Sequence, residues 1–254
     1  SERAVQAIRE CRGQVLITPS DKYCDARYSK STGGISEDAT SVWGEVIEGL
    51  DAVVDAPAGS HIHRFFPITE DNLVEYITGD WVKETDAFAS PNVAPESTLK
   101  RYLGRVDEVG EYFRWEKTLT QESLQESLRA RAGLTDLGQV LDLIPGKRGR
   151  SGRLETLRVD YLDTIGAPKS VVINREYYIR AALSKTFLYS SAILIDVQKD
   201  ATGVLKKAHL RGAGWGHGAG LCQIGGLGRA LKGQAFPEIL KHYYQGVRLE
   251  QIYP

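Results

Sequence analysis

Residues 212–226, GAGWGHGAGLCQIGG, place seven glycines around one Trp, one His, one Cys and one Gln. Because glycine lacks a Cβ and adopts positive φ readily, this loop can fold tightly and bring backbone N–H groups close to another group. Trp215 adds a flat ring, and His217 adds a nitrogen that titrates near neutral pH. Two interpretations follow: a binding loop, for which a sugar is a suitable guest, or a tight turn packed inside the fold with a structural His217.

Two other chemistries fit this loop less well. A nucleotide-binding loop ends in Gly-Lys-Ser/Thr or follows a strand with a later acidic residue, and neither pattern is present. Cys222 lies five residues after His217, whereas a cysteine peptidase brings its Cys and His together from distant segments. We therefore expect Cys222 to be an inert, buried thiol, and a peptidase that uses it is the most distant alternative.

The composition is that of an ordinary globular protein and excludes several kinds of partner. Lys and Arg number 32 against 33 Asp and Glu, so we expect no nucleic-acid partner, because such proteins carry a basic excess. No apolar run approaches the ~18 residues of a membrane-spanning helix, and we expect no span in this chain. The three cysteines form no CxxC pair, so they predict neither a zinc knuckle nor a disulfide framework.

Hydrophobic periodicity predicts the elements of the N-terminal part. Residues 2–12 place Val5 and Ile8 on one helical face, and Gly13 stands where the helix would end. Residues 14–29 are predicted as a hairpin, with strands at 15–17 and 23–28 around a turn. Residues 49–95, with four prolines, predict long surface loops with short helical pieces.

The remaining pattern mixes strands and helices. Strands are predicted over residues 113–119, 154–161 and 171–173, and a buried strand over 192–197. Helices are predicted between Thr120 and Gly133, after a capping Asn174, and from Pro237 to Gly246. We therefore predict an α+β fold with a mixed, β-rich core and several short helices packed around it.

Three further segments carry polar groups. The basic turn 148–153, RGRSGR, contains Ser151 and Arg153, and it could hold an anion or lie solvated at the surface. The hydroxyl-rich run 184–191 includes Lys185 and could donate hydrogen bonds to a polar ligand, although helix-cap and strand-edge bonds explain it equally well. His61 and His63 lack the further ligands of a metal site, so we expect no metal there.

In their order as well as their content, these segments resemble the stage II sporulation protein D family, also met as the amidase-enhancer type of cell-wall protein. The likeness weakens between about residues 49 and 110, which we interpret as an elaboration specific to this protein. We expect residues 1–254 to form a single domain of this type that lacks its N-terminal part. The matching elements are residues 4–16, 25–29, 33–34, 43–44, 151–154, 180–191, 214–218, 221–225 and 239–246.

The resemblance implies a lytic transglycosylase that cleaves peptidoglycan glycan strands and leaves 1,6-anhydro-muramic acid ends. In that reaction one Glu protonates the glycosidic oxygen and then accepts the proton of a sugar hydroxyl, which requires a pKa raised by burial. The family's catalytic Glu lies upstream of the element matched by residues 4–16, so we assign no catalytic residue here. The zinc site of some members also lies upstream, and we expect no cofactor in this chain.

We expect the remaining residues to form the glycan-binding cleft of a protein of the cell envelope or the extracellular space. Its expected partners are peptidoglycan glycan strands and other cell-wall hydrolases. The alternative is a non-catalytic wall-binding module that recruits or stimulates an amidase, so the sequence leaves open whether this chain is an enzyme. The predicted substrate-binding residues are His217, Gln223, Trp215, Ser151, Arg153 and Lys185.

Overall fold

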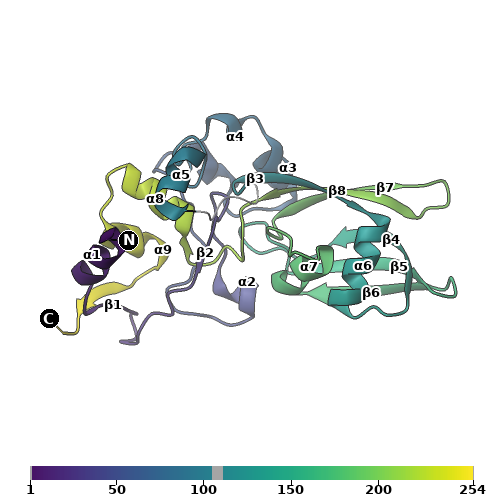
Figure 1. The fold of residues 1–254 in the computed structure, drawn as a ribbon, viewed down its shortest axis with the longest axis horizontal. Helices are drawn as coiled ribbons and strands as arrows, with labels where there is room; N and C mark the ends of the chain where they lie inside the picture. The colour runs from purple at the N-terminus through teal and green to yellow at the C-terminus, as the bar shows by residue number, and fades with distance from the viewer. Residues whose placement is uncertain (1, 105–110, 254) are drawn as a thin grey trace.

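The computed structural model describes residues 2–104 and 111–253 (Figure 1). Its helices and strands are mixed along the chain, which confirms the predicted α+β class. The strands form several small sheets, and two clusters of buried hydrophobic side chains hold the elements together. Residues 105–110, at the end of the predicted elaboration, lie outside the described part of the chain.

One hydrophobic cluster joins two three-stranded antiparallel sheets at the right of Figure 1. Leu119 and Leu210 contribute to it from one sheet, and Val140 and Val159 from the other. Helices α6 (Gln121–Ala132) and α7 (Glu176–Leu183) pack on each other beside these sheets. The first sheet has the strand order β3 (Arg114–Thr120), β8 (Leu205–Ala213) and β7 (Ile193–Lys199). The second has the order β4 (Leu137–Pro145), β5 (Thr156–Asp163) and β6 (Pro168–Asn174).

The ends of α6 follow from its sequence as predicted. The side chain of Thr120 accepts a hydrogen bond from the backbone N–H of Ser123 at 3.2 Å, and Gly133 after the helix has a φ of 70°. Helix α7 differs from the prediction, because its N-cap is Arg175 and not Asn174. Asn174 is still part of β6, where it pairs with Thr156 of the neighbouring strand.

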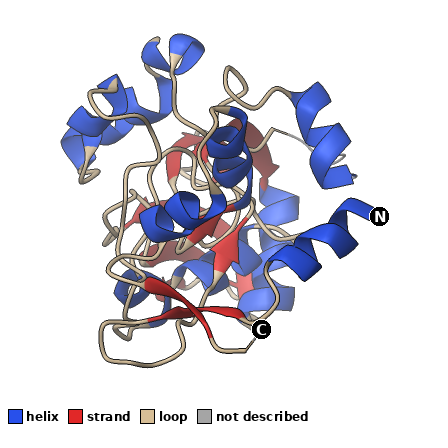
Figure 2. Cartoon of the chain, turned by 90° about the vertical axis from the view of Figure 1, so that its left-hand side faces the viewer, coloured by secondary structure: helices blue, strands red, loops and turns tan. Residues whose placement is uncertain are grey.

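The two ends of the chain lie together, at the left of Figure 1 and toward the viewer in Figure 2. β1 (Gln14–Ile17) pairs antiparallel with β10 (Arg248–Gln251). The predicted hairpin is reduced, within the described residues, to one bridge between Ile17 and Tyr23. β2 (Tyr28–Ser29) lies instead parallel to β9 (Leu221–Cys222), because each of these short strands finds a partner from the distant end of the chain.

Residues 49–104 contain the short helical pieces that the sequence predicts, but they are not a surface appendage. The rings of Phe65, Tyr76 and Trp81 pack against one another, and the first two residues are almost fully buried. Their apolar side chains belong to the second hydrophobic cluster, so this segment is part of the core. Its helices are η1 (His61–Phe65), α3 (Glu70–Thr78), α4 (Trp81–Glu84) and α5 (Glu96–Leu103).

The predicted first and last helices are confirmed as α1 (Glu2–Glu10) and α9 (Phe236–Tyr243), the latter ending three residues before Gly246. Two further helices, α2 (Ala39–Trp43) and α8 (Gln223–Leu231), were not predicted. The predicted buried strand at 192–197 is wrong in its burial, because β7 is an edge strand and most of it is partly exposed. Of the helices described, none combines the length and the apolar character needed to cross a membrane.

Candidate functional site

A groove of about 620 Å³ lies where β2, α2, the start of α7 and the glycine loop meet. Three tyrosines on its walls are more than half exposed: Tyr28 at 59%, Tyr177 at 56% and Tyr178 at 55%. Trp43 and Phe187 complete the aromatic lining. Exposed rings gathered in one hollow are unusual on a protein surface and are typical of a binding site.

Backbone strain is concentrated in the same groove. Among the described residues other than glycine, Asp21, Arg175 and Phe187 have a positive φ, and the last two line the groove. Their φ angles are 68° and 65°, and a sparsely populated backbone conformation costs an L-residue about 1 to 3 kcal/mol. Such strain persists where the surrounding structure enforces it, and it clusters at functional sites.

The groove carries more positive than negative charge. Lys30, Arg175 and Arg180 line it together with one carboxylate, that of Glu176. Glu176 Oε2 accepts from Arg180 Nη1 at 3.1 Å, and both side chains are largely buried. Lys30 Nζ lies 3.8 Å from the centre of the Trp215 ring.

His217 lies in this groove as a neutral imidazole. Its Nδ1 accepts a hydrogen bond from the backbone N–H of Ala219 at 3.1 Å, so the proton of the neutral ring is on Nε2. Burial, with the guanidinium groups of Arg153 and Arg180 nearby, lowers the pKa of His217 to about 4. The ring lies 5.0 Å from that of Trp43, and a hydrogen bond with the backbone of Tyr28 also engages it.

Trp215, the other ring of the glycine loop, supports the groove from behind. It stacks on Tyr189 at 4.2 Å between ring centres. Its backbone pairs with Ser31, whose N–H and carbonyl both bond to Trp215. Trp215 therefore acts on the groove through Lys30, which lies over its ring.

The glycine loop closes around the guanidinium group of Arg153. Arg153 is 2% exposed, and its Nε and Nη2 point to the carbonyls of Gly216 and Thr32, each at 3.4 Å. A Cβ on Gly218 would lie 2.2 Å from Arg153 Cζ, and one on Gly214 would lie 2.8 Å from Nη2. The glycines are therefore required by a side chain of this protein, which supports the interpretation of the loop as a tight internal turn.

A fully buried carboxyl group, that of Glu37, lies beneath the same loop and was missed from the sequence. Its Oε1 accepts from the backbone N–H groups of Asp38 at 3.1 Å and Arg150 at 2.9 Å. Its Oε2 accepts from Ser151 N at 3.1 Å and Ser151 Oγ at 2.6 Å. Burial raises the pKa of Glu37 to about 7, although the hydrogen bonds from Ser151 and the charge of Arg153 oppose the rise.

Comparison with known proteins assigns this chain to a family. A family model described as Domain of unknown function (DUF8618) matches residues 60–220. The chain belongs to this family. The DUF8618 region contains Arg153, Arg175 and His217, whereas Tyr28 and Trp43, on the α2 side of the groove, precede it.

One curated relative covers nearly the whole chain. Over 257 residues this DUF8618 protein is 24% identical to the protein named amidase enhancer from Bacillus subtilis (strain 168). The alignment covers 96% of the chain and 32% of the relative, so the chain spans about a third of that protein's length. The predicted likeness to the amidase-enhancer type of protein is thereby confirmed.

The predicted binding residues of the DUF8618 protein lie in three different places. His217 lines the groove, and Trp215, Ser151 and Arg153 lie behind or beneath it. Gln223 begins α8 and faces a small hollow beside Phe236, while Lys185 is exposed and paired with Glu126. Lys185 and Gln223 are not among the groove residues.

Cys222 and His61, which were also singled out from the sequence, both pack against other groups of the protein. Cys222 is fully buried, its Sγ accepts from the backbone N–H groups of Thr32 and Gly225, and burial raises its pKa to about 12. Such a thiol remains protonated at neutral pH and is a poor nucleophile. His61 stacks on the Trp81 ring at 6.3 Å between centres.

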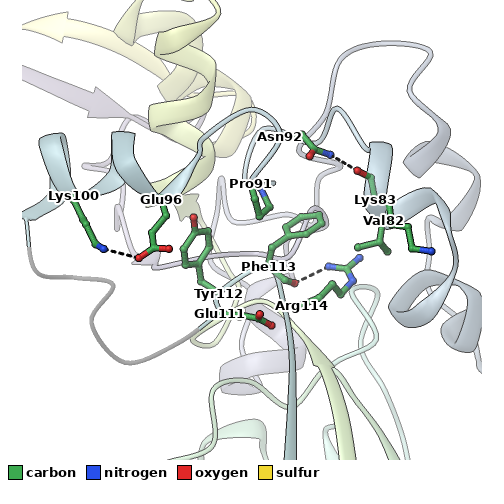
Figure 3. A pocket seen from close by; sticks show the side chains of 10 residues that line it. All are labelled: Val82, Lys83, Pro91, Asn92, Glu96, Lys100, Glu111, Tyr112, Phe113 and Arg114. Atoms are coloured by element: carbon green, nitrogen blue, oxygen red, sulfur yellow. Dashed lines mark hydrogen bonds and ion pairs between the residues drawn. The ribbon is translucent and has the colours of Figure 1, made fainter.

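A larger hollow, of about 830 Å³, lies between β3, α4 and α5 (Figure 3). Several of its charged groups are engaged with other protein groups: Lys100 pairs with Glu96 at 2.8 Å on the surface, and Arg114 donates to the carbonyls of Gly33 and Phe113, each at 2.8 Å. The aromatic groove, with its exposed rings and strained backbone, is therefore the stronger candidate for a binding site.

Proposed function

We propose that this chain is a non-catalytic module of the cell envelope that binds peptidoglycan glycan strands in the aromatic groove and stimulates a cell-wall amidase. The groove of exposed tyrosines is the observation that carries the binding part of the proposal. The alignment with an amidase enhancer over 96% of the chain supports the stimulating part.

The chemistry of the groove suits a sugar chain. The C–H faces of a pyranose ring are apolar and pack on aromatic rings, while its hydroxyl and acetamido groups need polar partners. Tyr28, Tyr177 and Tyr178 provide the rings, and the cations of the groove provide polar contacts. Wall-bound enhancer would raise the local concentration of a bound amidase at its substrate.

Glycan cleavage by this chain has less support. A lytic transglycosylase needs a carboxylic acid within reach of the glycosidic oxygen. The carboxylate that lines the groove belongs to Glu176 and is paired with Arg180. The carboxyl of Glu37 has the raised pKa of a proton donor, but it is 0% exposed and surrounded by donors.

Co-sedimentation with purified peptidoglycan tests the binding. We expect the wild-type chain to pellet with cell walls, and Tyr177→Ala and Trp43→Ala to weaken binding about tenfold each, since an aromatic anchor carries a large share of binding energy. Tyr102→Ala, which removes a ring that is 48% exposed outside the groove, is the matched control. Equal binding by all four proteins would remove the groove from the proposal.

An amidase assay tests the stimulation. The rate at which a cell-wall amidase releases stem peptides is measured with and without the chain, and mass spectrometry of the glycan products detects anhydro-muramic ends. A faster release without anhydro ends supports the module. If this chain alone produced anhydro ends, the non-catalytic module would be ruled out and the chain would be a lytic transglycosylase.

A further inference from the structure

We infer that Arg175 forms an anion-binding subsite in the groove, where its guanidinium group binds a carboxylate carried by the sugar chain. The inference rests on the proposed function and adds a specificity to it. A groove with this subsite prefers an acidic glycan to a neutral one built from the same kind of ring.

The backbone of Arg175 is held in a conformation that this residue does not favour. Its φ and ψ are 68° and 139°, outside the allowed regions of an L-residue. Its N–H donates to the Glu155 carbonyl at 2.6 Å, and its carbonyl accepts from the N–H of Ile179 at 3.2 Å. These bonds hold Arg175 between β6 and α7, so the protein bears a backbone cost for an arginine at this position.

The guanidinium group reaches across the groove toward α2. A Cβ built on Gly44, at the end of α2, would lie 3.8 Å from Arg175 Nη2. Arg175 is an exposed residue of the groove wall, and within the described part of the chain its guanidinium makes no hydrogen bond or ion pair. The group is therefore positioned over the groove and available to a ligand.

The other cations of the groove are engaged with the protein. Arg180 donates to the carboxylate of Glu176 at 3.1 Å and to the Leu188 carbonyl at 2.8 Å. Lys30 Nζ lies over the Trp215 ring. Since Arg180 and Glu176 compensate each other, the charge that remains toward a ligand is positive.

A carboxylate is the anion that matches this group. Guanidinium binds it through two parallel N–H···O bonds, a geometry that a neutral hydroxyl cannot reproduce. Peptidoglycan presents carboxylates from two sources: the stem peptides, and the lactyl group of muramic acid where the peptide has been removed. Both offer the same chemistry to Arg175, and the test distinguishes them.

The test compares three ligands: a neutral N-acetylglucosamine oligomer, peptide-free glycan strands and peptide-bearing strands. Affinities are measured by calorimetry at low and high salt. We expect the wild-type chain to bind one or both acidic ligands about five- to twentyfold more tightly than the neutral oligomer, with the preference reduced by salt. The acidic ligand that shows the preference identifies the source of the carboxylate.

Arg175→Gln removes the charge and keeps the strained backbone, and Arg101→Gln on α5 removes an exposed arginine outside the groove as the matched control. We expect Arg175→Gln to lower the affinity for the acidic ligands to about that for the neutral oligomer, and to leave the thermal unfolding unchanged. A preference that survives in Arg175→Gln, or that is lost equally in Arg101→Gln, overturns the subsite. Failure of the wild-type chain to bind any of the three ligands would instead overturn the proposed function.

Discussion

Ser151 Oγ lies 2.6 Å from Glu37 Oε2, and both side chains are 0% exposed. The same hydroxyl oxygen accepts a hydrogen bond from Arg153 Nη1 at 2.9 Å. One serine therefore connects a buried carboxyl group to the guanidinium group around which the glycine loop is folded. Because His217 belongs to that loop, the shape of the groove depends on this buried contact.

Replacing Ser151 by Ala should lower the free energy of unfolding by about 1 to 3 kcal/mol, since two buried polar groups lose a partner. Ser170→Ala is the matched control, because it breaks a serine–carboxylate bond of 2.7 Å to Asp160 on an exposed strand. The control should cost less than about 0.5 kcal/mol. Urea unfolding measures both variants, and equal losses would show that the buried contact is not special.

The stability should depend on pH through Glu37. Its pKa is raised from 4.5 to about 7 in the folded protein, so folding favours the protonated form. This contribution is present in full below about pH 4.5 and is lost as the pH rises to about 7, at most by about 3 kcal/mol. Glu37→Gln cannot titrate, so its stability relative to the wild type should rise over this range and stay constant above it.

That comparison uses unfolding free energies measured from pH 4.5 to 8.5. Gln at this position has a fixed cost, because its amide faces backbone N–H groups, but this cost does not vary with pH. A relative stability of Glu37→Gln that is flat over the whole range would mean that Glu37 is already ionised at the acid end.

His217 should produce the opposite dependence. Its pKa is lowered from 6.5 to about 4, so the fold favours the neutral ring. Its contribution to stability is present above about pH 6.5 and is lost as the pH falls to about 4. His217→Gln should therefore lose less stability than the wild type on acidification, as measured by thermal unfolding at several pH values, and His209→Gln on β8 controls for the loss of an imidazole elsewhere. A wild-type slope retained in His217→Gln would contradict this assignment.

Local signals in the sequence predict local features well. The Thr120 cap and Gly133 define α6, and the alternation over 154–161 predicts β5, because in both cases the deciding contacts lie within a few residues. The pairing of β1 with β10 joins the two ends of the chain, and nothing in either segment specifies the other. The α+β class was therefore predictable, and the sheet partners were not.

The candidate site shows the same limit. Seven glycines at 212–226 predict a tight loop, but the side chain that fills it, Arg153, comes from a segment about 60 residues earlier in the chain. Glu37 accepts bonds from residues more than 110 positions away. Arg175 was overlooked beside the expected cap Asn174, because a positive φ at an arginine has no sequence signal.

Gly218 and Gly166 have nearly the same φ but different surroundings. Comparing them distinguishes two reasons for a glycine in this fold: a positive φ, and a lack of space for a side chain. Gly218 has a φ of 82° and would place a Cβ 2.2 Å from Arg153 Cζ, whereas Gly166, with a φ of 83°, has no atom within 4 Å of its Cβ position. Gly166→Ala should therefore cost only the backbone strain, about 1 to 2 kcal/mol.

Gly218→Ala should cost about 3 kcal/mol or more, because the methyl group must also displace a buried guanidinium group or move the loop. It should also weaken glycan binding, since His217 is the neighbouring residue and lines the groove. Urea unfolding and co-sedimentation with peptidoglycan measure the two effects. Equal losses of stability in the two variants would show that Arg153 moves aside freely, and the link from Glu37 through Ser151 and Arg153 to the groove would then be lost.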